Sequence, residues 1–228
     1  MNTLRNILLP LTLLSCLSAP VQLVAQPPEG FEALFDGESM EGWFTVPENP
    51  QKTWKVDSKQ GTLGRSVRGG YIWTEKSYGD FILQLDYRIS RLCNSGVFFR
   101  TDPQNPVQGG FEIQILDSEV MELLGPGREK HANGALYDAV APSSDPAKPS
   151  GKWNSMRIRA KGDAVSIWIN GTLVVEADLS KWTTAEMNPD GSKNKFKTAL
   201  SKLPKTGHIG LQDHGYNVWF RNIFIKEL

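Results

Sequence analysis

Apolar residues occupy every second position from Phe81 to Ile89, and the positions between them are polar from Gln84 onward. A strict period of two places one set of side chains on each face of an extended strand, which a helix cannot reproduce. Shorter patterns of the same kind recur between turns rich in Gly, Pro, Asn and Asp, over residues 96–100, 111–116, 153–160, 165–170, 208–212 and 218–226. Asn170-Gly171 is a strong hairpin signal. The succession predicts an all-β, two-sheet antiparallel sandwich in which the last two patterns pair with each other.

The first 25 residues do not belong to this pattern. Arg5 precedes an apolar run over residues 7–17, which has the order and length of a secretory signal peptide and is short for a membrane span. Two processing routes remain open. Cys16 ends a Leu-Leu-Ser-Cys motif and would carry a lipid, whereas cleavage after Ala25 is slightly favoured because the apolar run continues past Cys16. We expect an exported protein, periplasmic or extracellular, with one domain over 26–228 and a lipid anchor only by the first route.

Charge and cysteine content narrow the function classes. Lys plus Arg and Asp plus Glu each number 25, so the formal net charge is zero, which argues against nucleic-acid or anionic-membrane binding. Processing leaves Cys93 as the one free cysteine, so no intrachain disulfide is expected. Seven Trp, 21 Gly and 14 Pro suit many turns and flat apolar side chains that stack on sugars, although most individual Trp are expected in the core.

Two long connections, 118–151 and 178–207, interrupt the strand patterns. Loops of this length in a sandwich are usually functional or disordered. The first carries His131, Tyr137 and Asp138 and is predicted to be functional. The second is polar and Lys-rich and is predicted to be a solvated insertion, with at most a short helix within 194–203.

Candidate site residues occupy the strand pattern at 111–116. Period-2 geometry turns the odd-numbered apolar residues toward the core and Glu112 and Gln114 toward the outer face. A bulge near Leu116 would bring Asp117 to the same face. Retaining glycosidases of the laminarinase type carry Glu-x-Asp-x-x-Glu on one strand. Gln114 at the place of the middle Asp argues against their two-carboxylate chemistry.

Two further segments contribute polar residues. Phe98 and Arg100 are expected to share a face, so that Arg100 points outward and can hold a sugar hydroxyl or a developing oxyanion. Gln212 and His214 alternate onto the face opposite the core residues of their segment. No sharp metal-ligand spacing occurs. Convergence of Glu112, His131 and His214 would nevertheless allow a divalent metal ion or acid–base chemistry.

Several motifs together carry a resemblance to one family: Leu34-Phe35-Asp36-Gly37, Gly42-Trp43, Asn94-Ser95-Gly96-Val97-Phe98-Phe99-Arg100, Glu112-Ile113-Gln114-Ile115-Leu116-Asp117, Gly134-Ala135-Leu136-Tyr137, Trp153-Asn154, Gly210-Leu211-Gln212-Asp213-His214-Gly215 and Phe220-Arg221-Asn222-Ile223. The sequence from about Phe31 to Leu228 resembles the 3-keto-disaccharide hydrolase domain family, a concanavalin A-like jelly roll common in exported bacterial proteins. The resemblance implies cleavage of glycosides whose sugar is oxidised to a ketone at C3.

That chemistry implies roles for the candidate residues. The ketone acidifies the proton on C2, whose removal allows elimination of the C1 substituent, and water then adds to the unsaturated sugar. Glu112 or His214 would be the base. Arg100, or a metal held by Glu112 and a His, would stabilise the enolate, while His131 and Tyr137 would serve the leaving group.

The remaining polar candidates are predicted to bind the carbohydrate substrate: Asn94, Ser95, Gln114, Asp117, Tyr137 and Gln212. No cofactor other than one divalent metal ion is expected, with at least one of Glu112, His131 and His214 as a ligand. The rival hypotheses are a non-catalytic carbohydrate-binding module and a structural domain of a surface complex. Titratable groups on one sheet face favour the enzyme over an aromatic binding platform, although the fold alone hosts both.

Overall fold

The computed structural model describes residues 25–46, 53–65 and 70–228, and in these ranges thirteen strands form two antiparallel sheets. The larger sheet has the order β11-β10-β9-β6-β13-β4-β3, with β1 also paired to β13. Its strands are β1 (Glu32–Ala33), β3 (Trp54–Asp57), β4 (Thr62–Arg65), β6 (Phe81–Ile89), β9 (Asn154–Lys161), β10 (Ala164–Ile169), β11 (Thr172–Asp178) and β13 (Val218–Glu227). The smaller sheet has the order β2-β5-β12-β7-β8. Its strands are β2 (Trp43–Thr45), β5 (Ile72–Tyr78), β7 (Asn94–Thr101), β8 (Phe111–Leu116) and β12 (Gly207–Leu211).

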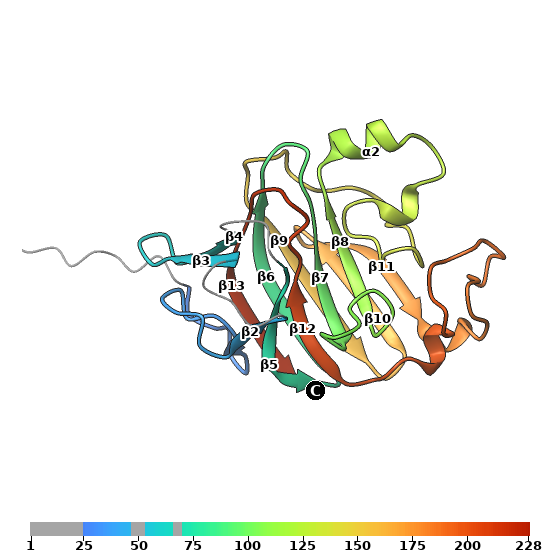
Figure 1. The fold of residues 1–228 in the computed structure, drawn as a ribbon, viewed down its shortest axis with the longest axis horizontal. Helices are drawn as coiled ribbons and strands as arrows, with labels where there is room; N and C mark the ends of the chain where they lie inside the picture. Colours follow the sequence, from blue (N-terminus) through green and yellow to red (C-terminus); the bar gives the residue numbers. More distant parts are fainter. Residues whose placement is uncertain (1–24, 47–52, 66–69) are drawn as a thin grey trace, which may run out of the picture.

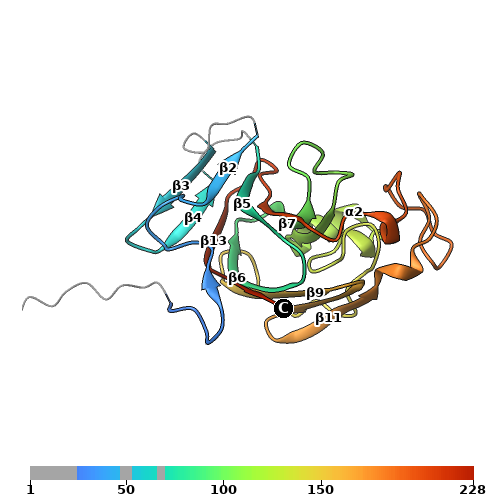
Figure 2. The same cartoon turned by 90° about the horizontal axis from the view of Figure 1, so that it is seen from below.

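The two sheets lie face to face, which confirms the predicted jelly-roll sandwich (Figure 1). The view from below separates the layers, with β6, β9 and β11 in one and β5 and β7 in the other (Figure 2). The predicted hairpin is present, because Asn170 and Gly171 adopt positive φ angles of 49° and 81° between β10 and β11. Asn and Gly tolerate this left-handed conformation better than other residues.

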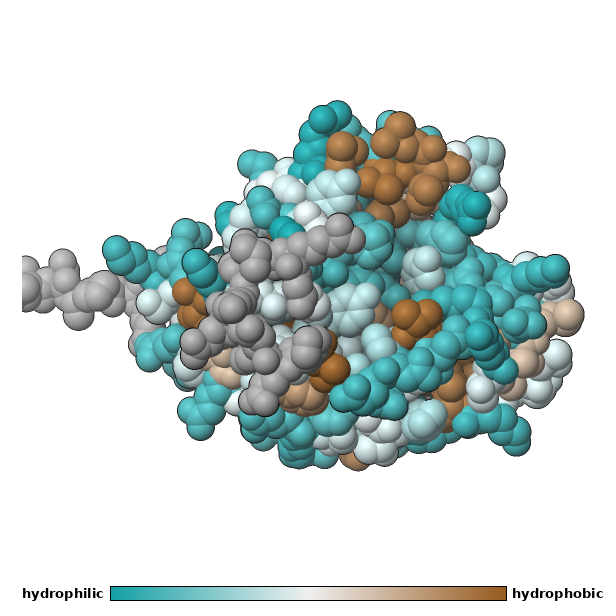
Figure 3. Space-filling view, viewed as in Figure 1, coloured by the Kyte–Doolittle hydropathy of each residue, from teal (hydrophilic) through white to brown (hydrophobic). Residues whose placement is uncertain are grey.

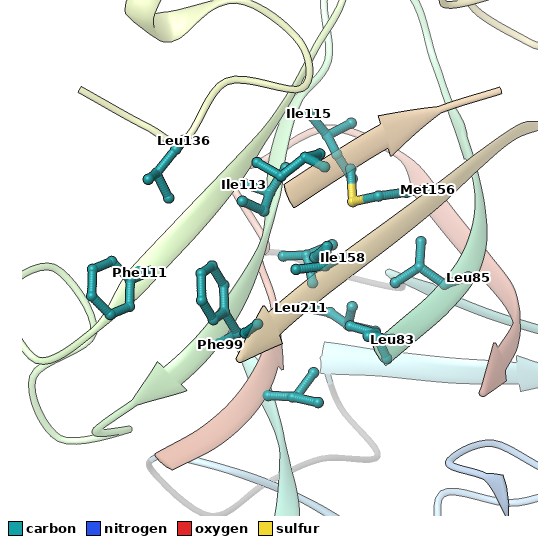
Figure 4. Packing of buried hydrophobic residues seen from close by; sticks show 14 of the residues in the cluster. Leu83, Leu85, Phe99, Phe111, Ile113, Ile115, Leu136, Met156, Ile158 and Leu211 are labelled. Carbon is teal, nitrogen blue, oxygen red and sulfur yellow. The ribbon is translucent and has the colours of Figure 1, made fainter. Parts of the chain in front are cut away.

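The core forms where the period-2 patterns of the two sheets meet. In β6 each odd-numbered residue is buried and each even-numbered one is partly exposed, as the alternation predicts. Phe111, Ile113 and Ile115 face it from β8 and are fully buried. Figure 4 shows Ile115 beside Met156 of the opposite sheet, and Phe111 beside Phe99. Each large apolar side chain buried here contributes roughly 1.5–3 kcal/mol.

The last two strands do not pair with each other, so that prediction was wrong. β12 lies between β5 and β7 in the smaller sheet, whereas β13 lies between β6 and β4 in the larger one. The connection at 212–217 crosses from one layer to the other. Where it reaches the larger sheet, the Ser90 amide donates to the Asn217 carbonyl at 2.9 Å. An alternating pattern shows which face of a strand is buried but not which strand is its neighbour.

Helical structure is confined to connections. α2 (Ser118–Leu124) follows β8, and the part of the chain that the structure describes has three 3₁₀ turns: η1 (Glu129–His131), η2 (Leu179–Lys181) and η3 (Leu200–Lys202). The short helix expected within 194–203 is thus reduced to η3. No helix in the described ranges is both long and apolar enough to cross a membrane. Cys16 and the rest of the predicted signal peptide before Ala25 lie outside these ranges.

Cys93, just before β7, is fully buried and makes no disulfide. Its amide donates to the Ser90 carbonyl at 3.2 Å, and its own carbonyl accepts from the Asp117 amide at 3.0 Å. Burial raises the pKa of the Cys93 thiol to about 12.

Candidate functional site

Glu112 lies on the face of β8 turned away from the core, as predicted. Its register partner on β7 is Phe98. Gly96, two residues earlier on β7, lies on the same face of the sheet. A β-carbon at Gly96 would lie 2.6 Å from Glu112 Oε1, so any larger residue there would displace the carboxylate. The connection after α2 covers this edge, because the Tyr137 amide donates to the Glu112 carbonyl at 2.9 Å. Glu112 is therefore only 7% exposed despite facing outward.

The Glu112 carboxylate accepts hydrogen bonds from two side chains. Gln212 Nε2 donates to Oε1 at 2.7 Å, and Lys195 Nζ donates to Oε2 at 3.5 Å. Burial raises the pKa of Glu112, although Lys195, Gln212 and His214 act in the opposite direction. A carboxylate removed from water and held by few partners is more basic than an exposed one, which suits a proton acceptor.

Lys195 comes from the second long connection, so the prediction of a solvated insertion was wrong at this point. The Lys195 amide donates to Asp138 Oδ2 at 2.5 Å, and its carbonyl accepts from Gln108 Nε2 at 2.9 Å. The next residue, Phe196, is buried in the core. Lys195 Nζ lies 4.1 Å from the centre of the Tyr137 ring, a favourable cation–π geometry.

His131 is one layer removed from Glu112. Its ring stacks on Tyr137 with centroids 4.7 Å apart, and Nε2 lies 3.1 Å from Asp138 Oδ1. Asp138 thus contacts His131 through one oxygen and the Lys195 backbone through the other. The structure joins His131 and Tyr137, as the sequence predicted, but it places His131 as a support for Tyr137 and Asp138.

An aromatic cluster lies on the same sheet face across β5 and β7. The ring centres of Tyr71 and Trp73 lie 5.2 and 5.3 Å from that of Phe98. Gly210 of β12 makes room for Trp73, because a β-carbon there would lie 2.3 Å from the indole ring. Trp73 and Phe98 are each 1% exposed, so the half-buried Tyr71 is the member that reaches solvent. Burial raises the pKa of Tyr71, and the Glu112 and Asp213 carboxylates raise it further.

His214 lies in the exposed turn after β12 and acts to lower the pKa of Glu112. Figure 3 shows the molecular face over β7, β8 and β12, which is hollowed below the apolar side chains of α2. Leu123 and Leu124 of that helix are exposed. This face thus combines the Glu112 carboxylate, the half-buried Tyr71 ring and the exposed apolar side chains of α2.

Five of the six predicted sugar-binding residues divide into two groups. Gln212 and Tyr137 contact the Glu112–Lys195 pair, as described above. Gln114 donates to Asn94 Oδ1 at 2.7 Å and to two backbone carbonyls, so these two side chains bind each other. Ser95 Oγ donates to the Gln212 carbonyl at 2.8 Å and is fully buried. Asn94, Ser95 and Gln114 therefore brace β7, β8 and the Gln212 backbone behind the site.

Asp117 is not on the outer face with Glu112, contrary to the predicted bulge. It is the N-cap of α2, where Oδ1 accepts from the Glu119 amide at 3.2 Å and Oδ2 accepts from the Leu92 amide at 2.7 Å. A carboxylate at this position satisfies helix N–H groups that lack a partner. The strand ends at Leu116 because the chain turns into the helix.

Arg100 does not point outward, so this prediction was wrong. Its guanidinium is fully buried and donates to the Gly79 carbonyl at 2.9 Å, the Gly162 carbonyl at 2.8 Å and Asp80 Oδ1 at 2.9 Å. Arg100 has a φ of 50°, which breaks the strand alternation and turns the side chain between the sheets. It ties together the β5–β6 and β9–β10 turns.

Replacing Arg100 with Gln is expected to lower stability by roughly 1–3 kcal/mol, because the Gly79 and Gly162 carbonyls and Asp80 lose their donor from the buried guanidinium. Chemical denaturation measures this change. Because Arg100 lies away from Glu112, kcat of the folded variant should equal that of the wild type. A large loss of kcat in a stably folded variant would show that Arg100 takes part in the reaction.

The predicted metal ligands do not form a shared donor set. Among the described residues, no three His, Cys, Asp or Glu side chains lie close enough to hold a metal ion. Glu112 faces the Lys195 ammonium, and His131 is bonded to Asp138 behind Tyr137. The residues present therefore do not fit a metal site.

A separate cavity of about 510 Å³ lies on the outer face of the larger sheet, lined in part by Trp168, Arg157, Gln84 and Asn222. It contains none of the residues that the sequence predicted as catalytic. The candidate site is the cluster on the smaller sheet, where the buried Glu112 carboxylate, the Lys195 ammonium and aromatic rings converge.

The comparisons place this jelly-roll sandwich among the carbohydrate-active proteins. Residues 30–226 match the model of the 3-keto-alpha-glucoside-1,2-lyase-like domain. The chain belongs to this family.

Three similar proteins support the assignment. A Bacteroides thetaiotaomicron protein named 3-keto-disaccharide hydrolase is 28% identical, over 88% of this chain and 79% of its own. A crystal structure from Parabacteroides distasonis, provisionally named a glycosyl hydrolase, is 34% identical with a TM-score of 0.78, over 87% of this chain and 99% of its own. A second such structure from that organism is 26% identical with a TM-score of 0.71, over 88% of this chain and 94% of its own.

Proposed function

We propose that this protein cleaves 3-keto-glycosides, including 3-keto-disaccharides, by removing the C2 proton and eliminating the C1 substituent, with hydration of the product. The observation that carries the proposal is the Glu112 carboxylate, buried on an outer sheet face between Gln212 and Lys195. The family and the name of the Bacteroides relative point to the same substrate class.

In the proposed reaction Glu112 accepts the C2 proton, and the electrons of the C2–H bond form an enolate whose charge lies on the C3 oxygen. The enolate then re-forms the C3 ketone, a C1=C2 double bond forms, and the C1–oxygen bond breaks. The departing oxygen takes a proton, for which Tyr137 and His214 are candidates. Water adds across C1=C2 to complete net hydrolysis. The raised pKa of Glu112 favours proton abstraction from carbon.

The substrate test compares 3-keto-glucosides with their unoxidised parents. Because only the ketone acidifies the C2 proton, we expect cleavage of the 3-keto compounds to be faster by at least about 10²-fold, a typical effect of general-base catalysis that the parents cannot use. Product analysis by NMR or mass spectrometry measures both rates. Equal rates, or action on the parents alone, would contradict elimination.

A non-catalytic carbohydrate-binding module is the second candidate, favoured by the aromatic cluster of Tyr71, Trp73 and Phe98. Two of these rings are almost fully buried, which leaves little of the cluster as a stacking platform. A binder would retain sugar affinity with no turnover of any 3-keto-glycoside. We further propose an exported location, which the N-terminal 25 residues support through their signal-peptide pattern.

A further inference from the structure

We propose that Lys195 is a catalytic residue that donates a hydrogen bond from its ammonium to the C3 oxygen of the substrate and stabilises the enolate. This inference rests on the proposed function and assigns to Lys195 the role that the sequence had given to Arg100. An electrophile is needed at the C3 oxygen, because negative charge develops there as Glu112 removes the proton.

The position of Lys195 relative to Glu112 carries the proposal. Nζ lies 3.5 Å from Oε2, at the long end of hydrogen-bonding distance. In the elimination the base acts at C2 and the electrophile acts on the oxygen of the adjacent carbon, so the two groups must lie side by side. An ammonium has three N–H donors, of which this contact to Glu112 takes one.

Lys195 lies at a partly dry position, where its surroundings lower the pKa of the side chain overall. The side chain is 23% exposed and that of Glu112 is 8% exposed. Burial disfavours the Lys195 ammonium, while the Glu112 carboxylate and the face of the Tyr137 ring both favour it. A cation in such a site interacts with a developing oxyanion more strongly than one in water.

Hydrogen bonds hold both the amide and the carbonyl of Lys195, so the backbone position of this residue is fixed. Asp138 accepts from its amide, Gln108 donates to its carbonyl, and Phe196 anchors the next residue in the core. Asp138 is in turn held by His131. His131 and Asp138 are therefore positioning residues for Lys195, which explains why a histidine sits near the site without reaching Glu112.

The experiment compares Lys195→Met, Lys195→Arg and the control Lys193→Met, an exposed residue of the same segment. With a 3-keto-glucoside in D₂O, NMR follows deuterium exchange at C2 alongside release of the C1 substituent. We expect Lys195→Met to lower kcat and C2 exchange by about 10²–10³-fold with an unchanged melting curve. Lys195→Arg should recover part of the loss, and Lys193→Met should match the wild type.

Three results would overturn the inference: full activity of Lys195→Met, a loss of activity that follows a lowered melting temperature, or a sugar adduct on Lys195 trapped by borohydride. Failure of the proposed function is recognised separately, as a wild-type protein that cleaves no 3-keto-glycoside. In that case titration calorimetry with the 3-keto sugar and its parent tests whether Lys195 contacts the C3 oxygen. A wild-type preference for the 3-keto sugar over its parent that Lys195→Met abolishes supports the contact, and no such preference overturns it.

Discussion

Glu112→Gln should reduce cleavage of 3-keto-glycosides by about 10²–10⁴-fold, the usual cost of removing a general base. Glutamine keeps the shape of the side chain and can still accept from Gln212, but its amide cannot take a proton from C2. The loss should therefore appear in kcat, with sugar binding close to that of the wild type. Steady-state kinetics and calorimetric titration with a 3-keto-glucoside separate the two effects.

The same substitution should leave stability unchanged or raise it slightly near neutral pH. Because burial raises the pKa of Glu112 above its unfolded value, its favourable contribution is complete below the ordinary Glu pKa and is lost as pH rises through the folded pKa. The advantage of Gln over Glu should grow across that window. Melting curves at several pH values measure it. An early-melting variant would make Glu112 a structural partner, and a stable, fully active one would move the base elsewhere, with His214 next.

Ile113→Ala should have the opposite outcome one residue along the same strand. Ile113 is fully buried, and Figure 4 shows it in the core beside Ile115. Truncation removes apolar contacts and leaves a cavity that the opposing sheet can fill only in part, so we expect a loss of roughly 2–5 kcal/mol. Urea unfolding followed by tryptophan fluorescence provides the measurement. A change below about 1 kcal/mol would mean that the strand faces had been assigned in reverse.

Strand patterns were the most predictable part of this molecule. The predicted ranges of β6 and β8 agree with the structure to the residue, because both strands bury one face against the opposite sheet. The outward direction of Glu112 follows from the same period. These elements depend on local alternation, which a sequence displays directly.

The misplaced residues depend on information that alternation does not contain. Arg100 turns inward because its φ of 50° interrupts the strand, and no neighbouring Gly or Pro announces this. Lys195 was missed because its polar segment has no periodicity. One signal in the sequence was Phe196, because an aromatic residue within a Lys-rich stretch indicates that part of the stretch packs against the core. Phe196 is buried there in the structure. Tyr71 and Trp73 reach the site through the pairing of β5 with β12, a neighbour relation across more than 130 residues.

The burial of Cys93 gives the folded protein a chemically silent thiol. Disulfide exchange requires the thiolate, and a thiol with a pKa of about 12 supplies almost none of it at neutral pH. Oxidants and mixed disulfides therefore react very slowly with Cys93 while the strands stay paired. Once β7 separates, the same sulfur becomes reactive and can link two chains. Oxidation thus acts selectively on the unfolded population, and resistance to covalent dimerisation in this protein is a consequence of its folding stability.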